Sequence, residues 1–179
     1  MPDDAPLLIT PLAPADITAH LPDLAALMQA CVEDGASIGY VLPFPRAEAE
    51  AFWTRQVLPA VAAGGRTLLA AWRGGRIVGT VQLDTDTPPN QPHRAEVRKL
   101  MVHPGQRRRG IARALMAELE RQAAARGRRL LTLDTRTGDT AEPLYTALGY
   151  ITVGTIPGYC ADAADPSRLD ATTIMYKAL

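Results

Sequence analysis

The sequence has few of the features that mark secreted, disulfide-bonded or membrane proteins. Its 179 residues include two cysteines, Cys31 and Cys160, which lie far apart and form no CxxC pair, so no disulfide framework is indicated. No apolar run reaches the roughly 18 residues that a membrane-spanning helix requires. The first residues, Met1-Pro2-Asp3-Asp4, lack the basic stretch of a secretory signal. We therefore expect a cytoplasmic protein that does not bind a membrane.

An excess of charge of one sign and clusters of metal ligands are also missing. The chain has 19 basic and 19 acidic side chains, whereas a nucleic-acid-binding protein shows a basic excess. Two basic clusters, Arg107-Arg108-Arg109 and Arg126 to Arg129, are local exceptions. Neither His93 nor His103 has a ligand partner four residues later, a common spacing in metal sites, and the third histidine, His20, is remote. Nucleic acids and metals are thus not expected as partners.

Hydrophobic periodicity predicts a mixed α/β fold within a single domain, residues 1–179. Hydrophobic residues make up 47% of the chain, which suits one core without disulfide staples. The predicted helices are 16–33, which Pro22 is expected to kink or restart, 46–62, about 108–126 and 140–148. The predicted strands are 7–12, 67–72, 77–83, 95–102, 130–134, 151–156 and 172–176. This order predicts a central sheet with helices on both faces.

Three motifs of other enzyme classes are either absent from this chain or lack the context that they require. A Walker A loop needs Gly-Lys-Ser/Thr, yet Gly110 is followed by Ile111 and Ala112, and the GxGxxG sequence of a Rossmann fold is absent. The segment 35–39 has the GxSxG letters of a serine hydrolase elbow, but a helix precedes it and no histidine follows His103. Nucleotide hydrolysis, hydride transfer and serine hydrolysis are therefore not indicated.

The segment from Val97 to Ala112 predicts a strand, a tight turn and the start of a helix. Pro104 and Gly105 force the turn, and Gly110 is small where the helix begins. The N–H groups of residues 107–112, the helix dipole and three neighbouring arginines together favour an anion. A pyrophosphate suits this chemistry. A solvated, basic helix start is the alternative.

Two motifs in this half of the chain resemble the GNAT superfamily of N-acetyltransferases. Arg107-x-x-Gly110-x-Ala112 is similar to the family signature Q/R-x-x-G-x-G/A, and residues 141–150 resemble the family element A-x-x-L-Y-x-x-x-G-F/Y. The resemblance implies a mixed sheet of six to seven strands, with a splay between the fourth and fifth strands that admits the thioester of acetyl-CoA. It also implies which residues bind this cosubstrate: Leu100, Met101, Val102, Arg107, Arg108, Arg109, Gly110, Ile111, Ala112 and Tyr145.

Further segments are similar to tabtoxin-resistance acetyltransferases, a group within this family. They lie at residues 35–39, 94–97, 99–102, 133–135 and 157–161, and the likeness runs from about residue 34 to residue 178. It implies that the acetyl acceptor is a small, amino-acid-like amine, such as a toxin or an antibiotic. Gly138 departs from the pattern, because many family members have an asparagine there that contacts the pantetheine region. That contact is therefore not transferred to this chain.

Three side chains are candidates for the chemistry, which needs a base for the amine and a proton for the departing thiolate. Glu96 precedes the three arginines at a spacing similar to that of the glutamate base in some family members; a surface ion pair with Arg94 or Arg98 is the alternative. Asp134 follows an apolar strand and would assist Glu96, bind the substrate ammonium or cap the backbone. Tyr145 matches the family's thiolate-facing tyrosine, or is a half-buried aromatic residue.

The acceptor is expected to contact the loops 34–42, 84–93 and 157–166, whose acidic residues could hold a cation or simply keep the loops soluble. Ser37, Tyr40 and Tyr159 are the expected substrate-binding side chains. A protein N-terminus or a protein lysine is the alternative acceptor, and a non-catalytic CoA-binding module is the alternative class. A monomer and a homodimer are both compatible with the sequence.

Overall fold

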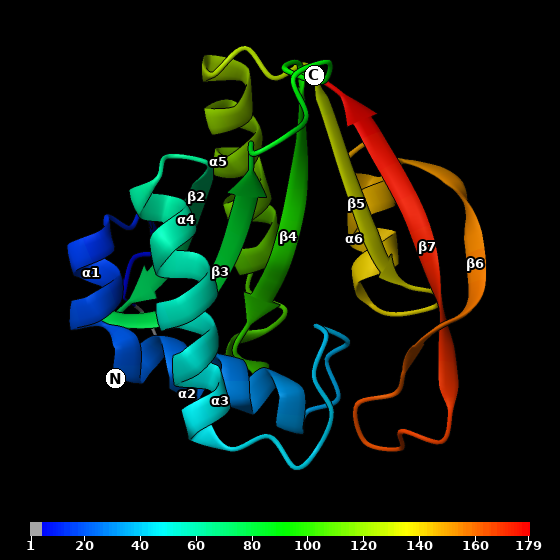
Figure 1. Ribbon diagram of the computed structural model, residues 1–179. Helices are drawn as coiled ribbons and strands as arrows, with labels where there is room; N and C mark the ends of the chain where they lie inside the picture. Colours follow the sequence, from blue (N-terminus) through cyan, green and yellow to red (C-terminus); the bar gives the residue numbers. More distant parts are fainter. Residues whose placement is uncertain (1–4) are drawn as a thin grey trace.

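One seven-stranded sheet runs through the computed structural model, which describes residues 5–179 (Figure 1). The strand order is β1-β2-β3-β4-β5-β7-β6, and among the described strands only β4 and β5 pair in parallel. The strands are β1 (Leu8–Pro11), β2 (Arg66–Arg73), β3 (Arg76–Asp84), β4 (Arg94–Val102), β5 (Leu130–Arg136), β6 (Ile151–Ala161) and β7 (Leu169–Ala178). The predicted mixed sheet is confirmed. Residues 1–4, on which the expectation about a secretory signal rests, lie outside the described residues.

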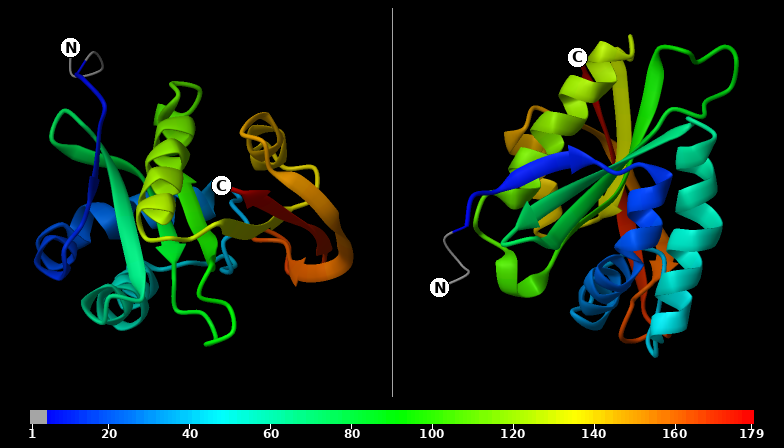
Figure 2. Two further views of the ribbon diagram at one scale, coloured as in Figure 1. Left: turned by 90° about the horizontal axis from the view of Figure 1, so that it is seen from above. Right: turned by 90° about the vertical axis from the view of Figure 1, so that its left-hand side faces the viewer.

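Helices cover both faces of this sheet (Figure 2). They are α1 (Pro14–Ala19), α2 (Leu21–Glu33), α3 (Arg46–Phe52), α4 (Leu58–Ala62), α5 (Ile111–Ala125) and α6 (Ala141–Ala147). Alternate residues of β2 enter two separate cores: Leu68 and Ala70 pack with α1 to α4, whereas Leu69 and Ala71 pack with α5. This alternation follows from the two-residue period of a strand. No helix in the described part of the chain is both long and apolar enough to cross a membrane.

Two of the predicted helices are interrupted, each near a proline. The predicted helix 16–33 is divided into α1 and α2, because Pro22 starts a new helix in whose first turn its missing N–H is not needed. The restart expected at Pro22 is therefore confirmed. The predicted helix 46–62 contains a π-helical turn, Trp53–Val57, between α3 and α4. Pro59 cannot donate to the carbonyl four residues earlier, which breaks the regular α-helical hydrogen bonding at this turn.

The hairpin of β6 and β7 is longer than the two predicted strands, 151–156 and 172–176. Both strands extend toward each other along the chain and leave a shorter connection at residues 162–168. The prediction that a loop begins at Pro157 was wrong. Proline is tolerated there because β6 is the edge strand, and the register between β6 and β7 shifts between Ile156 and Cys160.

Candidate active site

β4 and β5 part after a short paired stretch, and a cavity opens between them. The pairing begins with Arg94 opposite Leu130 and ends with Glu96 opposite Thr132. From Val97 onward β4 continues without β5 beside it, and Figure 1 shows the two strands diverging. The cavity has a volume of about 780 Å³ and is lined by β4, β5, α5, α6 and the loop that follows α2. The splay predicted between the fourth and fifth strands is confirmed.

The start of α5 forms one end of this cavity and presents N–H groups to it. Gly110 caps the helix with a φ of 78°, a left-handed conformation that glycine adopts without strain. The first hydrogen bond at this end runs from the Ala114 N–H to the Gly110 carbonyl, and the N–H groups of residues 111–113 have no acceptor within the described chain. Such N–H groups, together with the positive end of the helix dipole, favour an anion.

Most of the residues predicted to bind the cosubstrate line the cavity. They are Leu100, Met101, Val102, Arg107, Arg108, Gly110, Ile111, Ala112 and Tyr145. Arg109 is exposed and does not line it. The guanidinium of Arg107 donates to the carboxylate of Asp34 and to the Val102 carbonyl, so its orientation is already fixed by protein groups. Arg108 has no ion-pair partner among residues 5–179 and remains able to pair with a ligand phosphate.

Glu96 lies where the two strands part, and its carboxylate opens onto the cavity. The side chain is 40% exposed, and its Oε1 lies 3.8 Å from Nε of Arg98, so the alternative ion pair is present as a long contact. Arg94 does not join it, because its guanidinium donates to Gln91 and Thr132 instead. Since the contact with Arg98 is long and solvated, it leaves the Glu96 carboxylate able to accept a proton from a nucleophile in the cavity.

Asp134 faces the same cavity from β5, on the other side of the splay. Its side chain is exposed rather than buried, and β5 continues beyond it to Arg136. Thr172 on β7 donates a hydrogen bond of 3.1 Å to the Asp134 carboxylate. Among the described residues Asp134 has no cationic partner within 4 Å, which leaves one carboxylate oxygen for a substrate ammonium.

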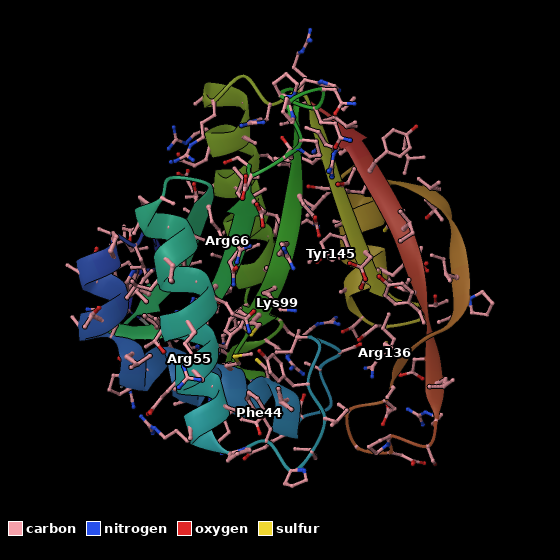
Figure 3. The ribbon with its side chains drawn as sticks, viewed as in Figure 1. Phe44, Arg55, Arg66, Lys99, Arg136 and Tyr145 are labelled. Carbon is pink, nitrogen blue, oxygen red and sulfur yellow. The ribbon has the colours of Figure 1, made fainter. Side chains whose placement is uncertain are left out.

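Tyr145 lines the cavity from α6 and is only 6% exposed. Figure 3 shows it beside the space between β4 and β5. Burial, followed by the negative charges of Asp134 and Asp139, raises the pKa of Tyr145 far above its ordinary value. The phenol therefore remains an O–H donor at neutral and moderately alkaline pH. The side chain is more buried than the half-buried alternative supposed.

Two of the three side chains predicted to contact the acceptor line the cavity. Ser37 lies on the loop after α2, and Tyr159 lies on β6. Tyr40 does not line the cavity, because its ring packs against Phe44 and Phe52 with centroids 4.7 and 6.0 Å away. The loop 84–93 does not line it either, so the expectation that this segment contacts the acceptor is not supported.

Lys99 also lines the cavity, although the sequence motifs assigned it no role. It lies in a bulge of β4, because Gln82 is opposite Arg98 while Thr80 is opposite Met101, which leaves β4 one residue longer than β3 between these pairs. Its φ of 51° is uncommon for a residue with a side chain. One sequence signal was available, namely a break in the alternation of the apolar residues that pack toward α5: Ala95, Val97, Leu100 and Val102.

The cavity thus combines an anion-binding end with two carboxylates, a protonated phenol and an ammonium group. This set can hold a phosphorylated ligand, accept a proton from a nucleophile and return a proton to a leaving group. Within residues 5–179, no group of three or more His, Cys, Asp or Glu side chains is placed to hold a metal ion.

Comparison with protein families gives a match over most of this site. The model of the acetyltransferase (GNAT) family matches residues 33–150. A curated relative from Azospirillum brasilense, named as an uncharacterized N-acetyltransferase in the hisH-hisA intergenic region, is 33% identical over 129 residues. That alignment covers 70% of this chain and 74% of the relative. The residues that the family model matches include β4, α5, β5 and α6, which line the cavity.

Solved structures share this fold over nearly the whole chain. Ribosomal-protein-alanine N-acetyltransferase from Brucella melitensis is 26% identical with a TM-score of 0.77, covering 96% of this chain and 99% of that one. A phosphinothricin acetyltransferase from Sinorhizobium meliloti, solved in complex with AcCoA, is 18% identical with a TM-score of 0.75, covering 97% and 88%. At that lower identity the likeness concerns the fold alone.

Proposed function

Because the chain belongs to the acetyltransferase (GNAT) family, we propose that it transfers the acetyl group of acetyl-CoA directly to the amine of a small, amino-acid-like substrate. One observation carries this proposal. A single cavity joins the N–H end of α5 to the carboxylates of Glu96 and Asp134 and to the phenol of Tyr145. An acetyl carrier with a pyrophosphate and an amine acceptor could both be held in that space.

The residues at the α5 end fit coenzyme A. The N–H groups of residues 111–113 and the guanidinium of Arg108 suit its pyrophosphate, and the unpaired edge of β4 from Leu100 to Val102 suits the amides of its pantetheine arm. When bound, acetyl-CoA would supply the activated acetyl group. The related fold of the Sinorhizobium meliloti enzyme, which is in complex with AcCoA, supports this assignment.

The side chains around the splay would then divide the proton chemistry. An amine with a pKa near 10 is mostly protonated at neutral pH, so a base must take up its proton, directly or through water. Glu96 is our choice for that base, and Asp134 would hold or help to deprotonate the incoming ammonium. The buried O–H of Tyr145 would donate to the thiolate sulfur that departs.

A small acceptor is favoured by two contacts between segments on this side of the molecule, of which the first lies at the cavity wall. Ser37 Oγ lies 3.6 Å from Cys160 Sγ, and the Leu42 N–H donates to the Ala163 carbonyl at 2.8 Å. Both contacts join the loop after α2 to the β6–β7 hairpin, which leaves less room for a polypeptide chain. The likeness of several segments to tabtoxin-resistance acetyltransferases points the same way and suggests a role in inactivating a toxin or antibiotic.

A protein N-terminus is the second candidate acceptor, because the Brucella melitensis structure bears the name ribosomal-protein-alanine N-acetyltransferase. Thiol release from acetyl-CoA, measured with small amino acids, polyamines and alanine-initiated peptides, separates the two candidates. Calorimetry with CoA tests the carrier site in the same preparation. If the protein binds CoA but acetylates none of these amines, it is a CoA-binding module instead, and the proposed transferase activity is wrong.

A further inference from the structure

Lys99 places an ammonium group on the acceptor side of the cavity, at a point where β4 leaves regular geometry. The bulge described above makes Lys99 the extra residue of β4, so its side chain belongs to neither core of the protein. A Cβ built on Gly39 would lie 3.4 Å from Lys99 Nζ, which places the ammonium directly beside the loop after α2. Figure 3 labels Lys99 on β4, across the splay from Tyr145.

The ammonium of Lys99 lacks a close counter-ion in the described chain. No carboxylate among residues 5–179 lies within 4 Å of its Nζ, and no hydrogen bond from it is formed. Other cations on this side are engaged: Arg98 donates to Asp84 at 3.1 Å, and Arg136 donates to Asp139 at 3.0 Å. Among these three cations, Lys99 is therefore the one that can pair with an anionic ligand.

The surroundings of Lys99 make an unpaired charge unfavourable. Burial, followed by the positive charge of Arg98, lowers the pKa of Lys99, while the negative charges of Asp134 and Glu96 oppose this shift without reversing it. A partly dehydrated cation gains more from a new anionic partner than an exposed one does, because less water has to be displaced and the screening is weaker. An anion bound beside Lys99 would offset the loss of hydration of its ammonium group.

We infer that Lys99 binds a carboxylate of the acetyl acceptor, so that the acceptor is an amine that also carries a carboxylate. This inference rests on the proposed N-acetyltransferase function and deepens it. The two carboxylates, Glu96 and Asp134, face the amine end of such a zwitterion, and Lys99 faces its acidic end. The phosphates of the carrier have their own site at the start of α5, which leaves Lys99 for the acceptor.

The test compares amino acids with their primary amides, such as L-methionine with L-methioninamide, by thiol release from acetyl-CoA. In the unmodified enzyme the acid is expected to be the better acceptor. Lys99→Met should lower the ratio of kcat/KM for the acid to that for the amide by about tenfold to a hundredfold, chiefly through KM, since one charged hydrogen bond is lost. Lys99→Arg, which keeps the charge, should retain most of that ratio.

Lys177→Met is the matched control, because Lys177 pairs with Glu120 outside the cavity, and it should leave the ratio unaltered. A second measurement does not depend on turnover or on a variant that folds. Lys99 and Lys177 are the two lysines of the chain. Amine acylation followed by mass spectrometry therefore reads each one separately. N-acetyl-L-methionine should slow the labelling of Lys99 but not of Lys177, and N-acetyl-L-methioninamide should protect neither.

The outcomes distinguish a wrong role for Lys99 from a wrong assignment of the transferase activity. If acids and amides are acetylated alike, if Lys99→Met keeps the preference, or if it weakens CoA binding instead, the role of Lys99 is refuted while the transferase activity stands. Equal protection of Lys99 by the acid and the amide also refutes it. If no amine is acetylated at all, the proposed function is wrong and the inference is overturned with it.

Discussion

Glu96 and Thr132 are the last paired residues between β4 and β5, so the carboxylate of Glu96 stands where the two strands part. A carboxylate at this point is held by a sheet on one side and open to the cavity on the other. The backbone of Glu96 is fixed by pairing with both neighbouring strands, whereas its side chain makes only the long contact with Arg98. Rigid placement with a free carboxylate is what a general base requires.

Glu96→Gln is expected to lower kcat by about 10²- to 10⁴-fold, because the amide cannot accept the proton of the acceptor amine. The affinity for CoA should stay close to that of the unmodified protein, since Glu96 lies away from the start of α5. Steady-state thiol release and calorimetry measure the two quantities. Asp134→Asn is the matched comparison, and a larger loss of kcat in that variant would move the role of principal base from Glu96 to Asp134.

Tyr145→Phe is expected to lower kcat by about a hundredfold, because the thiolate then departs without an O–H donor. The pKa of Tyr145 is raised by burial and by Asp134 and Asp139, so its neutral, donating form persists above the ordinary tyrosine pKa of about 10. The ratio of wild-type to variant activity should therefore remain constant from neutral pH to about pH 10. A ratio that falls with rising pH in this range would show that Tyr145 ionises there and would contradict the raised pKa, whereas a ratio close to one at neutral pH would contradict its role as the donor.

Asp84, at the end of β3, is predicted to stabilise the fold in a pH-dependent way. Burial alone would raise its pKa, but hydrogen bonds from Arg66 at 2.5 Å, the Asp86 N–H and Arg98 outweigh burial and lower the pKa below its ordinary value. A lowered pKa in the folded state means that the stabilisation is complete above about pH 4, the ordinary value, and is lost as the pH falls through the folded-state pKa.

Asp84→Asn should therefore lower the free energy of unfolding by about 2 to 3 kcal/mol at neutral pH, because Arg66 loses its charged partner in a buried site. The difference from the unmodified protein should shrink as the pH falls below about 4. Urea unfolding at several pH values measures this. Asp86→Asn, an exposed carboxylate on the adjoining loop, is the control and should show no such slope. A pH-independent difference would contradict the assignment.

The sheet and the helices on both of its faces could be predicted from the sequence because they follow from local periodicity. The residues of strands such as β2 alternate between two cores, and the repeat of α5 exposes one polar face. Each pattern therefore predicts its own element type from the local sequence. The start of α5 could be located because proline and glycine punctuate the turn before it. The π-helical turn in the predicted helix 46–62 was missed, because the helical spacing of the apolar residues continues through it from Ala49 to Val61.

The missed parts of the site depend on contacts between distant segments. Tyr40 was expected at the acceptor because it lies on the correct loop, but Phe44 and Phe52 draw its ring into the core. Lys99 was overlooked because a bulge at a non-glycine residue has no composition signal. The single clue was that Val97 and Leu100 pack toward the same helix although three positions separate them, which regular alternation forbids.

Gly79 on β3 is predicted to set how closely α5 approaches the sheet. A Cβ at this residue would lie 2.9 Å from the Met101 carbonyl oxygen and 3.2 Å from side-chain atoms of both Ile111 and Leu115. The first contact is with the backbone of β4, which cannot yield by a side-chain rotation, and the other two are with side chains of α5 that are fully buried. Gly79→Ala should therefore lower the free energy of unfolding by about 1 to 3 kcal/mol through overpacking.

The same substitution should weaken CoA binding, because Ile111 is the first residue of α5 and its displacement moves the N–H groups of residues 111–113. Calorimetry with CoA and thermal unfolding follow the two effects together. Gly154→Ala is the matched control, since a Cβ on Gly154 meets no atom within 4 Å, and it should leave both quantities close to those of the unmodified protein. If Gly79→Ala destabilises the protein yet binds CoA as before, the predicted coupling between Gly79 and the start of α5 is wrong.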